Sequence, residues 1–540
     1  MRRNVILALS LSNLCFFTAW REVLSPQGFS YLYYWKQYPG YAALEALVIN
    51  ATLLAVVFLL GFILLRRISS PPGTKVAHVV FIVTLLRVLN NIRAQFDSFT
   101  TSHLRLLFGR SGYVLIVIAV LSLLAFAIGR YGTRSVARGG VLLLLIWAPF
   151  GLIGLAQAVW LARKYGPPVT QQKIPAPELP GSGSGRRVVW LIFDELDQHL
   201  AFDARPEGFS LPEFDRFRSE ALVASNAYPP AGHTSQSIPA LLTGQLISQV
   251  QPTSPSELSL SIPSRNQNET WSSQADVFSD ARSLGQNTAL VGWCHPYCRV
   301  IGDRLTFCRW EPGTQRIDSS KLSLKQNLVR QEIDLLRLIP FAYRIATKWF
   351  PEPRRDYSGE HLIDTQALMK EADNVIADKR YGLVFIHMSL PHPPYIFDRS
   401  AGEFMSNPTG SYLDNLAAAD RALGMFRQKM ERAGIWDRTT VIISSDHWWR
   451  SDYWRNRVFW SEADLKFATQ QLDHRVPFMI KLADQNTKTT FTTPFNTVLT
   501  RELIGEILRG NLTQSAQLEA WLNLHRTIGE SPYQGYEDVE

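Results

Sequence analysis

The sequence predicts an α/β fold that follows a helical transmembrane domain in the chain. Five apolar stretches precede residue 165, a segment rich in Pro, Gly and Ser follows, and short apolar strands then alternate with amphipathic helices. Strands that alternate with helices favour a mainly parallel sheet between layers of helices. We therefore expect a transmembrane domain of about five helices over 1–164, a linker over 165–186, an α/β domain over 187–525 and a C-terminal tail over 526–540.

The transmembrane domain is predicted from apolar stretches at roughly 4–20, 42–65, 76–92, 112–129 and 141–162. The second, fourth and fifth are long enough and sufficiently free of charge to cross a bilayer. The first follows two arginines and also fits a signal peptide, but no small-x-small cleavage site comes after it. The third contains His78 and Arg87, so a span and a buried or interfacial helix both remain open for it.

The basic residues indicate how the chain is oriented in a membrane. The formal charge is +8, and much of the excess flanks the apolar stretches, at Arg2, Arg3, Arg66, Arg67, Arg130, Arg134, Arg138, Arg163 and Lys164. That placement indicates membrane topology rather than a nucleic-acid-binding face. With a cytoplasmic N-terminus, five crossings place everything after residue 165 outside. We expect an integral protein of a bacterial inner (cytoplasmic) membrane, with an extracytoplasmic α/β domain and no nucleic-acid partner.

The α/β domain is predicted from its alternating elements. Buried strands are expected at Val188–Phe193, Thr288–Val291, Leu383–His387, Thr440–Ser444 and Val476–Leu482, with helices at 213–221, 363–377 and 413–433. In such sheets, ligands bind beyond the carboxyl ends of the parallel strands. Polar residues that directly follow a strand are therefore the candidate site residues.

Three of these strands end in residues that can bind a metal. Asp194 and Glu195 follow the first, Asp446 and His447 follow the strand at 440–444, and His387 and His392 lie at the end of the strand at 383–387. Adjacent carboxylate and imidazole groups suit zinc or manganese. Taken singly, each is more often a helix cap, an ion-pair partner or a buried structural histidine.

The segment Gly232-His-Thr-Ser-Gln-Ser-Ile-Pro-Ala-Leu-Leu-Thr-Gly244 is predicted to run from a tight turn into a short apolar helix. Thr234 then lies at the mouth of that helix, where free N–H groups and the helix dipole favour an anionic group. A hydroxyl there is a candidate nucleophile once a base or a metal activates it.

Together these motifs resemble the sulfatase-like branch of the alkaline phosphatase superfamily, over roughly 187–510. VVWLIFDE matches the family's opening strand, and TSQSIPALLTG places Thr234 ten residues before the Gly of a Leu-Leu-Thr-Gly run. SSDH matches the closing strand, and YLDNLAAADRALG is similar to the helix that precedes it.

The resemblance implies roles for individual residues. Asp194, Asp446 and His447 would be ligands of a divalent metal, zinc or manganese, with Thr234 as the metal-bound nucleophile. Glu195 occupies the position at which some members of the family have a second acidic ligand. His392 and His474 look like pocket histidines that contact the substrate anion or a second metal, and His392 would serve as a catalytic proton donor.

Departures from the family narrow the expected chemistry. Sulfatases carry an oxidisable Cys or Ser followed by Pro and Arg, whereas this chain has Thr234, Gln236 and Ile238. A threonine behind membrane spans is similar to phosphoethanolamine transferases and lipoteichoic-acid synthases, which implies transfer of a phospho-group from a lipid to an envelope glycan or other acceptor. Hydrolysis of a phosphoric or sulfuric ester by water is the alternative, and a non-catalytic membrane scaffold the lesser one. Trp448 and Trp449 stand where many relatives have Gly, which leaves the substrate open.

Three cysteines, Cys294, Cys298 and Cys308, cluster in the α/β domain. Cys294-His-Pro-Tyr-Cys298 can suggest a metal site, but a structural zinc site needs four ligands. In an oxidising compartment a disulfide within the cluster is favoured. The sequence leaves open which two cysteines pair.

Overall fold

A computed structural model describes residues 2–24, 41–65, 67, 70–96, 101–165, 172–180, 185–254, 256–265, 267–311, 323–336, 338–339, 341–342, 357–407, 409–455, 460–468 and 474–525. The expected tail over 526–540 lies outside these residues, as do the parts 166–171 and 181–184 of the expected linker. The chain forms two compact units. The helical unit comprises 1–29, 36–169 and 317–354, and the sheet unit comprises 30–35, 170–316 and 355–540.

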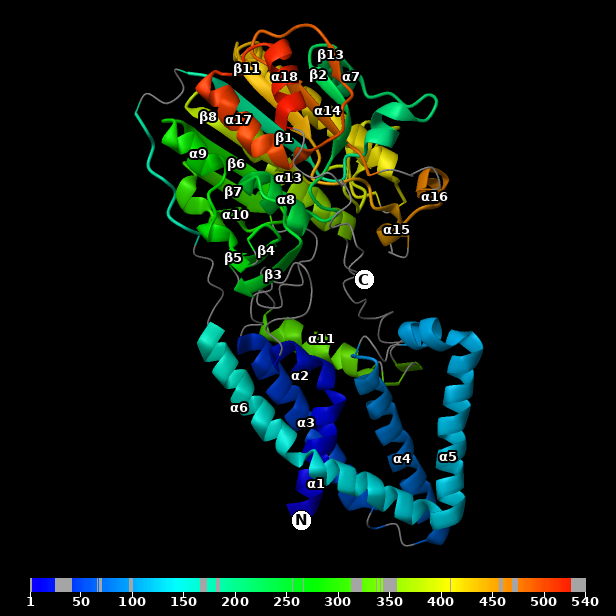
Figure 1. Ribbon diagram of the computed structural model, residues 1–540. Helices are drawn as coiled ribbons and strands as arrows, with labels where there is room; N and C mark the ends of the chain where they lie inside the picture. The colour runs from blue at the N-terminus through cyan, green and yellow to red at the C-terminus, as the bar shows by residue number, and fades with distance from the viewer. Residues whose placement is uncertain are drawn as a thin grey trace. The chain divides into compact units, whose positions relative to one another are not determined.

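The helical unit contains the apolar stretches found in the sequence (Figure 1). Its helices are α1 (Arg2–Cys15), α2 (Phe17–Leu24), α3 (Tyr41–Leu65), α4 (Pro71–Arg93), α5 (Thr101–Ile146), α6 (Ala148–Tyr165) and α11 (Leu324–Leu336). Three stretches in the described residues are long and apolar enough to cross a membrane: Tyr41–Leu65, Pro71–Arg93 and Ser111–Arg163. The second of these contains the third expected stretch, and the last contains the fourth and fifth.

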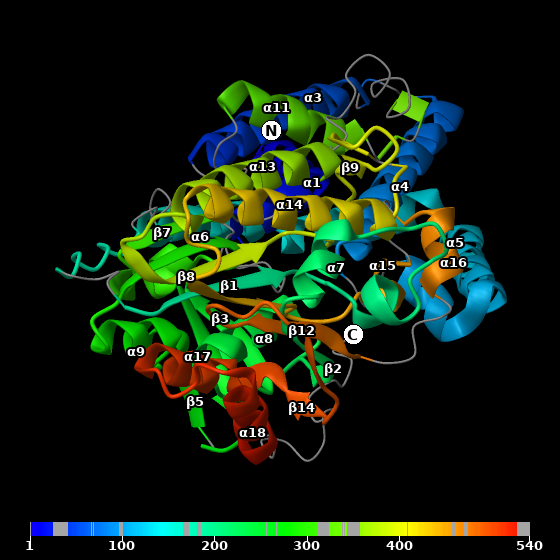
Figure 2. The ribbon, with the colours of Figure 1, turned by 90° about the horizontal axis from the view of Figure 1, so that it is seen from above.

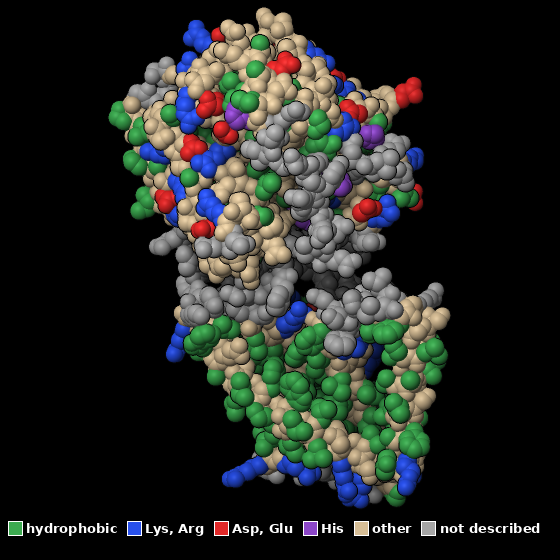
Figure 3. All heavy atoms as spheres, viewed as in Figure 1, with side chains coloured by type: hydrophobic (Ala, Val, Ile, Leu, Met, Phe, Trp, Pro, Cys, Tyr) green, Lys and Arg blue, Asp and Glu red, His purple; other side chains and the backbone are tan. Residues whose placement is uncertain are grey.

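Apolar side chains cover the outside of these helices, as Figure 3 shows for one face. On α3, Leu53, Val57 and Leu64 are each more than half exposed. A large apolar surface of this kind needs an apolar surrounding. The helical unit is therefore suited to insertion into a membrane.

Helix α11 follows the strands of the first half of the sheet in sequence but packs against α3 in the helical unit. The Nδ2 group of Asn50 donates to Gln331 Oε1 at 3.2 Å, and Gln331 Nε2 donates to the Ala43 carbonyl at 3.0 Å. An ion pair at 2.5 Å joins Arg330 to Glu22. The expected α/β domain over 187–525 thus contains a segment that packs with the helical unit, where Asn50 and Gln331 are buried against each other.

The sheet unit confirms the predicted α/β class. Its main sheet runs in the order β13-β2-β12-β11-β1-β8-β6-β7, and β14 also pairs with β2. The strands from β11 to β7 in this order are parallel, whereas β12 is antiparallel to both β11 and β2. The bounds are β1 (Arg187–Phe193), β2 (Leu222–Tyr228), β6 (Asn287–Trp293), β7 (Phe307–Glu311), β8 (Tyr381–Met388), β11 (Thr439–Ser444), β12 (Val476–Lys481), β13 (Thr489–Phe491) and β14 (Phe495–Asn496).

Helices cover both faces of this sheet, and strand β1 shows why. Its side chains alternate between two buried clusters: Val189, Leu191 and Phe193 belong to one cluster, and Val188, Trp190 and Ile192 to the other. Such a strand must be buried on both sides. One face packs on α7 (Pro212–Arg218), α13 (Tyr357–Ile376) and α14 (Tyr412–Arg432), and the other on α8 (Thr234–Thr243), α9 (Val277–Ser283), α17 (Thr500–Arg509) and α18 (Ser515–His525) (Figure 2).

Smaller elements complete the sheet unit. A three-stranded antiparallel sheet is formed by β3 (Gln249–Ser254), β4 (Glu257–Ile262) and β5 (Gln267–Thr270). The others are β9 (Phe397–Asp398), β10 (Glu403–Phe404), α10 (Tyr297–Val300), α15 (Ser451–Trp454) and α16 (Glu462–Ala468).

The cysteine cluster forms one disulfide, between Cys298 and Cys308. It links α10 to β7, and Cys294 remains a buried free thiol, as does Cys15. A disulfide within the cluster was the favoured expectation, and it removes Cys298 from any metal site built on the Cys294–Cys298 motif.

Candidate metal centre and nucleophile

Three neighbouring parallel strands, β11, β1 and β8, bring the candidate ligands to one edge of the sheet. Asp194 directly follows β1, Asp446 and His447 follow β11, and His387 is the penultimate residue of β8. Parallel strands present their carboxyl ends at the same edge. All four side chains are fully buried there.

The nucleophile candidate Thr234 is the first residue of α8, with His233 as the N-cap. Its Oγ1 atom lies 3.0 Å from His447 Nε2 and 3.3 Å from Asp194 Oδ2. Ser237 Oγ donates to the Asp446 carbonyl at 2.5 Å and joins the first turn of α8 to the end of β11. The structure therefore brings together Thr234, Asp194, Asp446 and His447, which the sequence analysis had placed in separate motifs.

The donor atoms of this cluster fit a divalent cation. Ligand atoms of Asp194, Asp446 and His447 all lie within 4.8 Å of one another. Among the described residues, Asp194 Oδ1, Asp446 Oδ2 and His387 Nε2 are buried and have no hydrogen-bond partner. Buried polar atoms without partners are costly, and a cation bound between them would satisfy them. Mixed carboxylate and imidazole donors suit zinc or manganese.

His387 is a further ligand candidate at this centre. Its Nε2 atom lies 3.4 Å from Asp194 Oδ2. On the other side of the ring, Nδ1 is 2.8 Å from the Tyr297 hydroxyl. A ligating imidazole commonly uses its second nitrogen in this way, which fixes the tautomer and the ring orientation.

Burial dominates the electrostatics of the cluster. It is the main cause that raises the pKa of Asp194 and that of Asp446 to about 7, and repulsion from the Asp194 carboxylate contributes to the raised pKa of Asp446. Burial also lowers the pKa of His387 to about 4 and that of His447 well below its ordinary value. Neutral imidazoles can act as ligands, and a bound cation would offset the cost of two buried carboxylates.

Glu195 has a different environment from Asp194. Its backbone φ is 64°, and its carboxylate accepts hydrogen bonds from Arg450 Nε at 2.9 Å and from Trp454 Nε1 at 2.8 and 2.9 Å. Ligand atoms of Asp194, Glu195 and His392 nevertheless also lie within 4.8 Å of one another. A role for Glu195 as a second acidic ligand stays a prediction.

The two pocket histidines expected from the resemblance are held by aromatic neighbours. The His392 ring packs edge-on against Trp293 and Trp454, with centroids 4.6 and 4.9 Å away, and its Nδ1 atom contacts the Pro393 carbonyl. The His474 ring stacks on Trp448 at 3.9 Å. Their roles toward a substrate anion stay predictions.

Sequence reasoning missed several residues of the centre. Arg450 bonds to Glu195 and to His233, and His295 Nε2 lies 2.9 Å from the Thr234 carbonyl. His295 lies two residues beyond the end of β6, as Asp446 lies two residues beyond β11, so a search for polar residues just after strands could also have found it. The Cys294–Cys298 motif had drawn attention to its cysteines instead.

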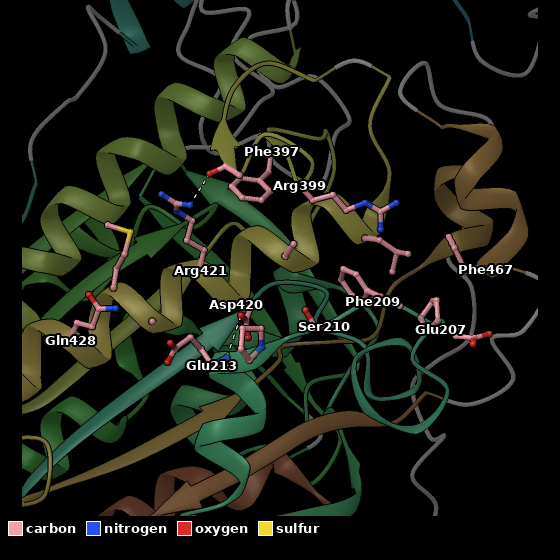
Figure 4. Close-up of a pocket in the computed structure, with 18 residues that line it drawn as sticks. Glu207, Phe209, Ser210, Glu213, Phe397, Arg399, Asp420, Arg421, Gln428 and Phe467 are labelled. Carbon is pink, nitrogen blue, oxygen red and sulfur yellow. Dashed lines mark hydrogen bonds between the residues drawn. The ribbon is translucent and has the colours of Figure 1, made fainter.

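A separate cavity of about 900 Å³ lies between the loop at 206–212 and α14 (Figure 4). Phe209, Phe397 and Arg399 are among its lining residues, and the residues of the candidate metal centre are not. At its base, Asp420 accepts a hydrogen bond from the Phe214 amide at 2.8 Å.

Ligands for a metal and an adjacent hydroxyl at one sheet edge are the parts of a hydrolase-type enzyme. The sulfatase family model matches residues 186–500, more than half of the 540 residues. The chain belongs to the sulfatase family. Enzymes of this family are metal-dependent, which agrees with the donor set described above.

Several solved structures are similar to this chain. The sulfatase PsFucS1 from Pseudoalteromonas sp. is 15% identical, with a TM-score of 0.40, and the match covers 63% of this chain and 75% of that one. The phosphonate monoester hydrolase SpPMH from Silicibacter pomeroyi is 13% identical, with a TM-score of 0.37, and the match covers 60% and 73%. A protein of the alkaline phosphatase superfamily from Vibrio parahaemolyticus is 13% identical, with a TM-score of 0.34, and the match covers 61% and 68%. None of the curated proteins compared with this chain matches it.

Proposed function

We propose that this protein is a membrane-anchored, divalent-metal-dependent transferase that moves a phospho-group from a lipid to an acceptor in the bacterial envelope. Thr234 would be the nucleophile, and the sheet unit would lie on the extracytoplasmic side of the inner membrane. The observation that carries the proposal is a threonine hydroxyl within 3.0 Å of His447 and 3.3 Å of Asp194, in a chain that also has apolar helices.

The residues around Thr234 support phosphoryl rather than sulfatase-type chemistry. Threonine cannot be oxidised to the aldehyde on which sulfatases depend. At the positions where those enzymes have Pro and Arg, Gln236 donates to the Ser248 carbonyl at 2.8 Å and Ile238 is fully buried in the core. Gln236 is held by this hydrogen bond and Ile238 packs in the core, so neither side chain replaces the Pro or the Arg of the sulfatase motif.

Each residue of the centre has a role in the proposed mechanism. Asp194, Asp446, His447 and His387 would hold the cation, which when bound lowers the pKa of a nearby hydroxyl and stabilises charge on phosphoryl oxygens. Thr234 Oγ1 attacks the phosphorus in line, a new P–O bond forms, and the bond to the lipid alcohol breaks with its electron pair on the leaving oxygen. The N–H groups at the start of α8 stabilise the anionic phosphoryl oxygens.

His392 is suited to move the protons. A carbonyl can only accept, so the Nδ1 atom that contacts Pro393 carries the hydrogen, and Nε2 is the nitrogen that exchanges a proton. Burial holds the pKa of His392 well below its ordinary value, so the ring is neutral at rest. The Thr234 hydroxyl releases its proton to solvent as it attacks, and Nε2, which takes up a proton from solvent, passes it to the leaving oxygen. In the second half-reaction an acceptor alcohol replaces Thr234 as the nucleophile.

Hydrolysis is the second candidate function, in which water resolves the phospho-threonine. The family membership favours it, since the sulfatase family is hydrolase-type. Transfer and hydrolysis use the same first step and differ in the final nucleophile.

The test uses the full-length chain in lipid nanodiscs with its divalent metal. We expect Thr234→Ala to abolish turnover of a phospholipid donor, and the wild type to yield a phosphothreonine peptide by mass spectrometry. Thr243→Ala is the matched control, because it removes from the same helix a buried hydroxyl that donates to the Pro239 carbonyl, one turn earlier, at 2.6 Å. Lipid and glycan mass spectrometry then separates the two candidates: a modified acceptor supports transfer, and free phosphate ester alone supports hydrolysis. Wild-type turnover in Thr234→Ala would refute both.

A further inference from the structure

Arg450 is a buried cation beside the nucleophile, and the mechanism above gives it no task. It lies three residues after His447, at the N-cap of α15. Its Nε and Nη2 atoms bond to Glu195 Oε1 at 2.9 and 2.8 Å, and its Nη1 atom bonds to His233 Nδ1 at 2.6 Å. The side chain is 13% exposed, whereas that of Glu195 is fully buried. The guanidinium group of Arg450 is thus held by a buried carboxylate, while part of the Arg450 side chain remains exposed to solvent.

These bonds tie Arg450 to both sides of the nucleophile. His233 is the N-cap of α8 and directly precedes Thr234. Glu195 directly follows Asp194, whose Oδ2 atom lies 3.3 Å from Thr234 Oγ1. One residue, His233, therefore separates the guanidinium group from Thr234 along the first path, and two residues, Glu195 and Asp194, separate them along the second.

The hydrogen-bond inventory of Arg450 leaves donors for a ligand. A guanidinium group has one N–H on Nε and two on each terminal nitrogen. The bonds to Glu195 and His233 use one hydrogen on each nitrogen. Because a guanidinium group can only donate, His233 Nδ1 is the acceptor in its bond with Arg450. One N–H on each terminal nitrogen remains, and charged N–H donors of this kind suit a phosphoryl group.

Arg450 also competes with a second metal ion for Glu195. The cluster of Asp194, Glu195 and His392 has the composition and spacing of a metal site. However, the Glu195 carboxylate already accepts from Arg450 and Trp454, and its charge is matched by the guanidinium group. A cation bound at Glu195 would have to displace these donors.

We propose that Arg450 supplies the positive charge that a second metal ion would otherwise supply at this centre. Its guanidinium group pairs with the Glu195 carboxylate, which restricts the chain to one metal ion. Its remaining N–H groups donate to an oxygen of the phosphoryl group being transferred. The inference rests on the proposed function in taking that group to be a phosphoryl group. It makes Arg450 a substrate-binding catalytic residue, and Glu195 and His233 the residues that position it.

The test measures phosphate binding separately from turnover. Inorganic phosphate is titrated by calorimetry into the full-length, metal-loaded chain in detergent, in the Thr234→Ala background so that no covalent step occurs. We expect Arg450→Gln to weaken phosphate binding by about 10- to 100-fold, as for loss of charge-assisted hydrogen bonds, and Arg450→Lys to weaken it less. Arg455→Gln is the matched control, because this nearby arginine pairs with the exposed Asp452 and should leave binding unchanged.

A second measurement counts metal ions per chain by mass spectrometry. We expect one ion per wild-type chain, and equal phosphate affinity in Arg450→Gln or two ions in the wild type would overturn the inference. Removing Arg450 alone leaves a buried unpaired carboxylate, which can prevent folding. If Arg450→Gln does not fold, the double variant Arg450→Gln/Glu195→Gln, which removes both charges, is used for the same phosphate titration. Transfer without any effect of Arg450 on phosphate binding would refute this inference alone, and weakened phosphate binding without transfer would refute the proposed function alone.

Discussion

Tyr297→Phe gives a sharp test of the metal centre, because it changes one oxygen atom next to a candidate ligand. The Tyr297 hydroxyl lies 2.8 Å from His387 Nδ1, and the residue is fully buried. Its ring packs so closely on Gly292 that a Cβ there would lie 2.4 Å from the ring. A phenylalanine ring therefore keeps its place, and the change is confined to the lost hydrogen bond.

The expected effect follows from the cost of that loss. A buried donor left without its partner costs about 1–3 kcal/mol, and loss of the group that orients a metal ligand lowers metal affinity about 10- to 100-fold. We expect a decrease of this size for zinc or manganese, measured by competition with a chelating fluorophore on the full-length chain. Tyr395→Phe is the control, since it removes a buried hydroxyl that bonds to Asp464 Oδ2 at 2.7 Å, outside the centre. If Tyr297→Phe folds normally and binds metal as tightly as the wild type, His387 is not a ligand.

Two further predictions concern stability. Burial raises the pKa of Asp420 from 3.8 to about 6, so its contribution is fully present below pH 4 and is lost as the pH rises to about 6, a change of at most roughly 3 kcal/mol. Denaturant titrations of the full chain at several pH values should show this loss in the wild type and not in Asp420→Asn; identical pH profiles would contradict it. Cys298→Ala/Cys308→Ala removes a short covalent loop and should lower the free energy of unfolding by about 2–4 kcal/mol, seen as a lower melting temperature that no longer depends on a reducing agent. Cys294→Ala keeps the disulfide, so its melting temperature should still fall under reducing conditions as in the wild type, and loss of that dependence in Cys294→Ala would contradict the pairing.

The sequence predicted the sheet well because local pattern decides it. β1 and β8 are continuous apolar runs, and such runs mark strands that are buried on both faces. The candidate ligands Asp194, Asp446 and His447 were found for a related reason, since each lies just beyond a strand end. The structure places them together with Thr234, as the parallel order of β1 and β11 requires.

What the sequence did not predict depends on contacts between distant residues. Arg450 meets Glu195 across 255 positions, and Tyr297 meets His387 across 90. No spacing rule links such pairs, because the sheet order and the loop conformations bring them together. The same holds for α11, whose partner Asn50 is 281 residues from Gln331.

The packing of α11 on α3 changes what a cut in the chain would release. The chain leaves the sheet unit before residue 317, belongs to the helical unit until 354, and then returns to the sheet unit. A protease that cleaves only within 165–186 therefore leaves the sheet unit joined to the helical unit through both ends of this segment. A truncated chain that begins at β1 would carry α11 without α3, and its buried Asn327, Gln331 and Ile333 would lose their cover. Release of a well-behaved water-soluble fragment thus requires cuts on both sides of α11 as well as in the linker.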